Sequence, residues 1–187
     1  MAGPRQNTKT GWLSFQKLAE EDGFKLLFDA ELTFALDADV LWQQMALAFT
    51  DTAKSWGWPS QYSTSAPVAS PLHEGGEIRT TYAMPRRKDP SAPWYSFTYG
   101  YRMLKWRPEA RIFQYHTDDA HPLNGGALVR IDALAPGQSR LNWHGVYRLA
   151  TDQEKIGDSF AWFFPIFIRA LEDRLLAGPP AGEQASA

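Results

Sequence analysis

Alternating apolar and polar residues predict a series of β-strands. From Phe24 to Leu36 every even position is apolar, while Lys25, Asp29 and Glu31 stand among the odd positions. Side chains of a strand point alternately to its two faces, so this segment is typical of a half-buried strand. Comparable strand signals recur at residues 61–65, 77–84, 95–106, 111–117, 127–134 and 140–149.

Turn-forming residues separate these segments. They are Gly75-Gly76, Pro108-Glu109, Asn124-Gly125-Gly126 and Pro136-Gly137. Glycine, proline and asparagine favour the backbone conformations of tight turns, and short turns join successive strands as antiparallel hairpins. The pattern therefore predicts an antiparallel sheet of about six to seven strands.

Two short helical pieces are expected after the first strand. Asp37 suits the N-cap of a helix whose apolar positions are Val40, Leu41, Met45 and Phe49. A second piece over residues 51–56 ends before Trp58-Pro59.

A long C-terminal helix is predicted to begin at the capping box Thr151-Asp-Gln-Glu154 and to continue to Leu176. Gly178-Pro179-Pro180 stops it, and Pro165 is expected to kink it. Phe160, Phe163, Phe167 and Leu171 recur at helical spacing, so we expect this face to pack on the sheet.

The element order predicts the α+β class, with a strongly curved sheet wrapped around the C-terminal helix. The sheet has one apolar face, and this helix is the only element long enough to cover it. A kink at Pro165 would hold one end of the helix away from the sheet and open a cavity.

An aromatic stripe marks the expected wall of that cavity. The stretch WYSFTYGYRMLKW at 94–106 places Tyr95, Phe97, Tyr99, Tyr101 and Met103 on one face of a strand. Buried phenol groups need hydrogen-bond partners, whereas an aliphatic core strand brings none. The stripe therefore indicates either a partly wet binding wall or a core in which each phenol finds a backbone partner.

Three segments together resemble the START-like superfamily, also called SRPBCC or polyketide cyclase/dehydrase and lipid-transport proteins. They are ELTFALDADVLWQQM at 31–45, MLKWRPEARIFQY at 103–115 and GQSRLNWHGVYRL at 137–149. The resemblance covers about residues 24–178 and implies the helix-grip fold, with an elongated hydrophobic cavity between sheet and C-terminal helix. Because the superfamily shares no catalytic motif, it supplies no active-site residue.

With that cavity, the sequence favours binding of a small hydrophobic or aromatic, lipid- or polyketide-like molecule without a cofactor. The expected lining residues are Tyr82, Phe97, Tyr99, Tyr101, Met103, Trp143, Trp162, Phe163 and Phe167. One alternative is a cofactor-independent enzyme of polyketide cyclase or dehydratase type, with Tyr99, Tyr101 and the loop residue His73 as candidates for proton transfer. Another is a protein-interaction module with a filled core.

The remaining histidines suggest surface positions. His116 and His121 flank Asp118 and Asp119, but this spacing matches no helical zinc motif, so we predict a solvated turn and no metal site. Strand parity places His144 on the face opposite Trp143, and therefore in solvent.

Composition narrows the classes further. A net charge of -2 argues against nucleic-acid binding, and the absence of cysteine excludes disulfides and thiolate metal sites. The longest apolar run, residues 160–168, is shorter than the roughly 20 residues of a membrane span. The first residues lack the pattern of a secretion signal, so we expect a cytoplasmic protein.

We expect a single domain over residues 24–178, an N-terminal extension at 1–23 with a short helix near Trp12–Glu21, and a flexible tail at 179–187. Oligomeric state is left open by the sequence.

Overall fold

The computed structural model describes residues 25–89, 91–118, 121, 123–149 and 154–179. Seven strands form one antiparallel sheet in the order β1-β7-β6-β5-β4-β3-β2. The strands are β1 Lys25–Phe34, β2 Ser63–Pro67, β3 Glu77–Met84, β4 Tyr95–Arg107, β5 Ile112–Thr117, β6 Leu123–Ala135 and β7 Gln138–Leu149. The helices are α2 Ala38–Thr50, α3 Glu154–Ala177 and the 3-10 turns η1 Thr52–Lys54 and η2 Pro108–Ala110.

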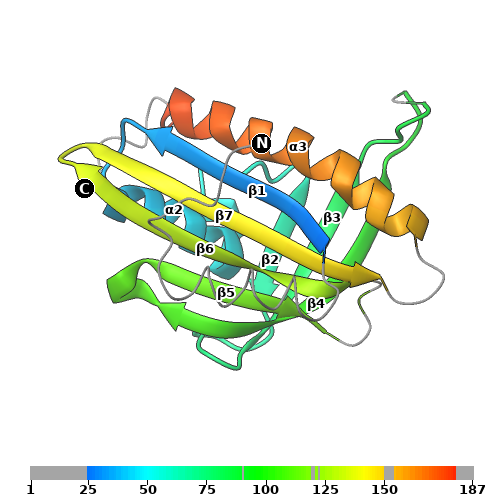
Figure 1. Cartoon of the computed structure of the whole chain (residues 1–187), viewed down its shortest axis with the longest axis horizontal. Coiled ribbons are helices and arrows are strands. Elements are labelled where there is room, and N and C mark those ends of the chain that lie inside the picture. Colours follow the sequence, from blue (N-terminus) through cyan, green and yellow to red (C-terminus); the bar gives the residue numbers. More distant parts are fainter. Residues whose placement is uncertain (1–24, 90, 119–120, 122, 150–153, 180–187) are drawn as a thin grey trace.

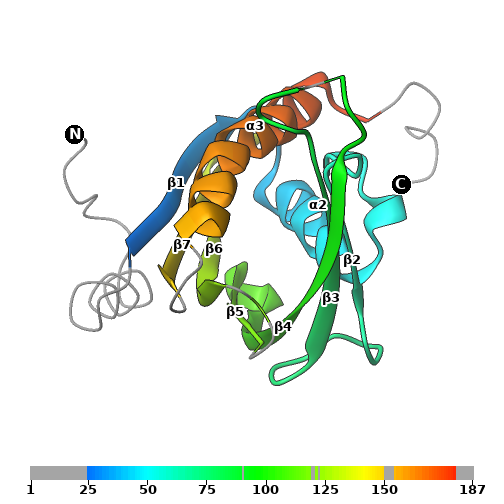
Figure 2. The same ribbon diagram turned by 90° about the vertical axis from the view of Figure 1, so that its right-hand side faces the viewer.

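The sheet curls so that both α-helices lie on its concave side. Figure 2 shows the strands curving from β1 through β5 to β2, with α3 closing the open side and α2 inside the curl. In Figure 1, α3 runs alongside β1. The buried helix side chains include Leu41, Met45 and Phe49 on α2, and Phe160, Phe163, Phe164, Phe167, Leu171 and Leu175 on α3. The predicted α+β class and the sheet wrapped around a C-terminal helix are confirmed.

Within the described segments, the helices agree with the sequence pattern. The 3-10 turn η1 takes the place of the second helical piece. Asp37 stands at the N-cap of α2, but its Oδ1 accepts the Gly137 N–H at 2.8 Å instead of capping the helix. Pro165 lies within α3 on its exposed side. α3 ends where Gly178, at φ 74°, donates its N–H to Arg174 O.

One predicted turn is wrong. Asn124, Gly125 and Gly126 lie inside β6, where all three pair with β7 and Gly126 also pairs with β5. A Cβ on Gly125 would lie 2.2 Å from Val146 O, and one on Gly126 would lie 2.3 Å from Tyr115 O. A glycine within a strand lets the backbones of adjacent strands approach closely, and these two glycines serve that purpose instead of forming a turn.

Several predicted exposures also differ, among them that of Tyr95, which was placed on the aromatic stripe but is 53% exposed. His144 is on the face opposite Trp143, as parity requires, but only 3% of its surface is exposed. It lies in β7 between β1 and β6, opposite Asp29 and Leu128, so side chains from both neighbouring strands shield it. Its Nδ1 lies 2.5 Å from Asp29 Oδ1. Val40, predicted on the apolar face of α2, is 37% exposed.

The expected helix near Trp12–Glu21 and the first three residues of the capping box lie outside the described residues. Within the described part, no helix is long and apolar enough to cross a membrane.

Candidate functional site

Two small cavities lie on the concave side of the sheet. The first, of about 30 Å³, lies between the sheet and α3; its wall includes Phe28, Tyr82, Tyr101, Tyr115, His121, Gly126, Phe160 and Phe164. The second, of about 10 Å³, is lined among others by Trp58, Trp143 and Phe167. Four residues line both cavities and so form the partition between them: Tyr82, Tyr101, Tyr115 and Phe164.

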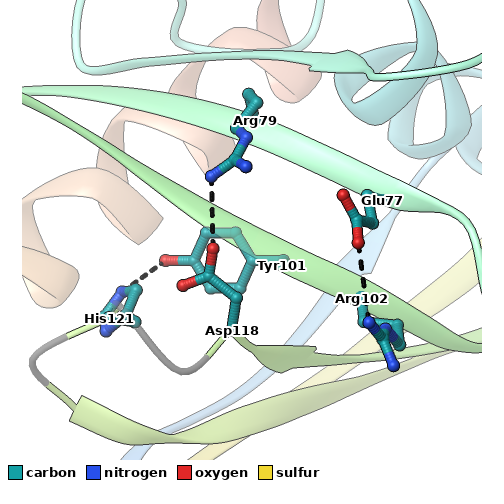
Figure 3. A network of polar contacts seen from close by, with 6 residues as sticks. All are labelled: Glu77, Arg79, Tyr101, Arg102, Asp118 and His121. Carbon is teal, nitrogen blue, oxygen red and sulfur yellow. Dashed lines mark hydrogen bonds and ion pairs between the residues drawn. The ribbon is translucent and has the colours of Figure 1, made fainter.

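A chain of hydrogen bonds crosses this interior. The hydroxyls of Tyr82 and Tyr101 lie 2.7 Å apart, and the Tyr101 hydroxyl lies 2.9 Å from His121 Nε2. Figure 3 shows the second contact, with His121 reaching Tyr101 from the segment that follows β5. Each of the three residues is only 7% exposed. Three polar groups from three parts of the chain thus meet in an otherwise aromatic interior.

Sheet register and ring packing hold the three groups in place. Tyr82 on β3 pairs with Phe97 on β4, and Tyr101 on β4 pairs with Ile78 on β3. The curl of the sheet allows these side chains to converge above its concave face. The His121 ring packs 4.2 Å from the Tyr99 ring, centroid to centroid.

The backbone determines which nitrogen of His121 carries the proton. Leu123 N–H donates to His121 Nδ1 at 3.0 Å, so Nδ1 is an acceptor. In a neutral imidazole the other nitrogen then bears the hydrogen. His121 Nε2–H therefore donates to the Tyr101 oxygen.

Burial keeps these groups uncharged at neutral pH. It lowers the pKa of His121 to about 4, and the nearby Asp118 carboxylate opposes that change only in part. Burial likewise raises the pKa of Tyr82 to about 12, and raises those of Tyr101 and Tyr115 well above the usual value. Desolvation disfavours the charged form of each group, so the interior presents neutral hydrogen-bonding groups.

An ion pair on the outer face anchors the segment that carries His121. Arg79 Nη1 lies 3.2 Å from Asp118 Oδ2, and Asp118 N–H donates to Gly100 O at 3.0 Å. His121 N–H in turn donates to Asp118 O at 3.1 Å. The Arg79 side chain is exposed to solvent. The pair therefore fixes the position of His121 from the opposite side of the sheet.

The outer face itself carries a polar hollow of about 270 Å³. Its wall includes both ion pairs drawn in Figure 3, Arg79 with Asp118 and Arg102 with Glu77. Each arginine already faces a carboxylate, so the hollow presents balanced charge.

The structure brings part of the predicted site together. Tyr82, Tyr101, Trp143 and Phe167 line the cavities. The others border neither cavity but pack around them: Phe97, Tyr99 and Trp162 are partly buried against the core, and Met103 and Phe163 are fully buried. Contact of these residues with a ligand stays a prediction.

His73 lies apart from this group. It is exposed, its Nδ1 lies 3.0 Å from Pro71 O, and it lines neither cavity. The geometry therefore gives it no place in chemistry within the cavities.

His121 corrects the prediction of a solvated turn, since it is 7% exposed and its ring packs against Tyr99 and Phe160. His116 is partly buried, and its Nδ1 lies 2.7 Å from Thr117 O. The described residues contain no group of three or more His, Asp or Glu side chains that could hold a metal ion.

Sequence reasoning also missed Tyr115 and Phe164 as lining residues. Parity in the segment 111–117 identifies Tyr115 as inward-facing together with Phe113, and both are buried. Phe164 lies one position beyond Phe163 in the helical pattern, and its ring stacks on Phe28 at 4.5 Å. No comparable pattern in the sequence identified His121.

Comparison with known proteins gives similarity of structure only. No family model matches the chain, and no curated protein matches it by sequence. Ginseng major latex-like protein 151 from Panax ginseng aligns with a TM-score of 0.59 and 10% identity, covering 82% of this chain and 96% of that one.

Two similar structures belong to enzymes. Norcoclaurine synthase from Thalictrum flavum, in complex with dopamine and hydroxybenzaldehyde, gives a TM-score of 0.57 at 12% identity, over 82% of this chain and 85% of that chain. The Zhui aromatase/cyclase from Streptomyces sp. R1128 gives a TM-score of 0.52 at 12% identity, and the alignment covers 82% of this chain and 92% of that chain.

The chain is thus an α+β protein with the helix-grip fold and an aromatic interior that contains buried polar groups. The resemblance to the START-like superfamily is confirmed at the level of this fold.

Proposed function

We propose that the chain binds a small hydrophobic or aromatic molecule between its sheet and α3. The observation that carries this proposal is the chain Tyr82–Tyr101–His121 inside an aromatic enclosure. A core that serves only packing gains nothing from phenol and imidazole groups, because desolvating them costs free energy that hydrogen bonds only offset. Groups of this kind on a cavity wall orient a ligand.

Binding requires the interior to open. A cavity of roughly 150 Å³ accommodates benzene, whereas the two cavities measure about 30 and 10 Å³. Phe164 borders both, so a change in its rotamer or a shift of α3 would join them. A ligand therefore enters by displacing the phenyl rings of α3.

The same geometry favours binding over catalysis. Proton abstraction needs a free base, but His121 Nδ1 already accepts the Leu123 N–H. The described residues that line the two cavities include no Asp or Glu. The tyrosines are neutral and their pKa values are raised, so they act as donors. We therefore place the cyclase or dehydratase reading second.

The structural neighbours support a small-molecule role. One of them was solved with dopamine and hydroxybenzaldehyde, and another is an aromatase/cyclase. At 12% identity they contribute no residue roles to this chain.

Native mass spectrometry tests the proposal first, followed by organic extraction and identification of any molecule that co-purifies. A titration of the isotopically labelled protein with naphthalene, observed by NMR, then locates the site. We expect shift changes at Tyr101, Tyr115 and Phe164. Ala127→Met, which fills the first cavity from β6, should abolish them, while Leu104→Ala on the outer face should not.

Thermal unfolding of both variants checks that they fold. A protein that purifies empty and shows no shift changes up to the solubility limit of naphthalene would have a filled core. The function would then lie on the outer surface.

A further inference from the structure

The hydrogen-bond chain Tyr82–Tyr101–His121 contains one more donor than it has hydrogen bonds. Three donors belong to it: the Tyr82 and Tyr101 hydroxyls and His121 Nε2–H. Only two contacts join them, Tyr82 to Tyr101 and Tyr101 to His121. Whichever way the hydroxyls rotate, one O–H has no acceptor among these three side chains.

A second unused donor borders the same space. Trp143 is 2% exposed and lines the second cavity, and its Nε1–H has no partner at full hydrogen-bond geometry among the described residues. A weak hydrogen-bonding contact with the Tyr115 hydroxyl, short of full geometry, offsets part of the rise in the pKa of Tyr115. An indole N–H donates and cannot accept, so its partner must supply an acceptor atom.

Two acceptors on the walls are already in use. His121 Nδ1 is bonded to Leu123 N–H. Trp58, the other indole of the second cavity, donates to Ser63 O at 2.9 Å. A buried donor without a partner costs free energy, whereas an unused second lone pair costs less. The interior therefore offers a ligand two donors, the surplus hydroxyl proton and the Trp143 Nε1–H.

We propose that this site, if it binds as proposed above, selects aromatic molecules that carry a carbonyl oxygen over hydrocarbons of the same shape. One carbonyl oxygen has two lone pairs, and can accept both the surplus hydroxyl proton and the Trp143 Nε1–H. Tyr82, Tyr101 and Trp143 all line the second cavity, so the two donors border one space. Trp143 is thus a specificity-determining residue.

Acetophenone and ethylbenzene are suitable probes because they differ mainly in the carbonyl group. Their dissociation constants are measured by NMR titration of the full chain. We expect acetophenone to bind about 25-fold more tightly than ethylbenzene, since each of the two added hydrogen bonds contributes roughly fivefold. The infrared carbonyl band of bound acetophenone should move to lower wavenumber.

Trp143→Phe and Trp58→Phe form a matched pair. Both replace an indole in the second cavity, but only the Trp143 N–H is unbonded. We expect Trp143→Phe to reduce the carbonyl preference about fivefold, and Trp58→Phe to leave it unchanged. If Trp143→Phe does not fold, the wild-type Trp143 indole N–H resonance still reports: acetophenone should shift it downfield and ethylbenzene should not.

The outcomes separate the two proposals. Binding of neither probe overturns the proposed function and this inference with it. Equal binding of both probes, or an indole resonance that responds to both alike, leaves the function standing and overturns the carbonyl selectivity. Equal loss of preference in the two tryptophan variants would assign the selectivity to cavity shape.

Discussion

Arg79 and Asp118 form an ion pair directly over Gly100, where a Cβ would lie 1.9 Å from Asp118 Oδ2 and 2.6 Å from Arg79 Nη1. Only glycine leaves room for this contact on the outer face. Because Asp118 O also accepts His121 N–H, the pair links the outer surface of the sheet to the interior.

Asp118→Asn should lower the pKa of His121 below its value of about 4, since the Asp118 carboxylate favours the protonated imidazole. NMR titration of carbon-13-labelled histidine measures this. Glu77→Gln is the control, because Glu77 pairs with Arg102 on the same face. A His121 pKa that is unchanged or raised in Asp118→Asn would show that the Asp118 carboxylate does not stabilise the protonated imidazole.

Acid should destabilise the protein through His121. Its pKa falls from 6.5 in the unfolded chain to about 4 in the fold, so the unfolded state binds more protons between these values. The free energy of unfolding contributed by this group is therefore complete above pH 6.5. It decreases as the pH falls, by up to about 3 kcal/mol near pH 4.

Chemical denaturation of wild type and His121→Gln across this pH range measures the effect. The wild type should lose stability relative to the variant on acidification. Parallel curves would show that His121 is not desolvated.

Removing the link at Tyr101 should cost more than removing the Tyr82 hydroxyl. Tyr101→Phe leaves His121 Nε2–H without an acceptor, at a cost of about 1–3 kcal/mol, whereas Tyr82→Phe removes the end of the chain. A double-mutant cycle by urea denaturation measures their coupling, expected at about 1 kcal/mol. Additive effects would mean that the two hydroxyls do not interact.

Gly126→Ala should be more harmful than Gly137→Ala. At Gly126 the new methyl group meets backbone, 2.3 Å from Tyr115 O, so β5 and β6 must separate. At Gly137 no atom would contact the new methyl group. The substitution there loses roughly 1–2 kcal/mol of stability, because alanine is strained at a φ of 70°. Thermal unfolding of the two variants compares these costs, and a smaller loss for Gly126→Ala would refute the close contact.

The fold was accessible from the sequence because its signals are local. The alternating pattern predicted strand β3 with its observed bounds, Glu77–Met84. Helical spacing predicted which face of α3 is buried. Alternation failed where the register shifts between Met103 and Lys105. There odd-numbered Lys105 is exposed and even-numbered Trp106 packs against the core, the reverse of the parity set by the stripe.

The site was less accessible because its contacts are not local. The approach of His121 to Tyr101 depends on the curl of the sheet and on the Asp118 anchor, and neither is encoded in residue spacing. Gly125 and Gly126 were misread because a glycine pair is common in turns and equally compatible with strands in close contact. Trp143 was placed correctly by parity, but its unbonded N–H emerges only with its neighbours in place.

Trp58 and Trp143 border the same small cavity, with ring centroids 5.8 Å apart. At this separation excitation passes readily between the two indoles. A carbonyl compound entering beside them would accept an electron from the excited pair and quench their emission. Of the eight tryptophans of the protein, these two lie beside the proposed binding cavity, so a change in their emission would report its occupancy without a label.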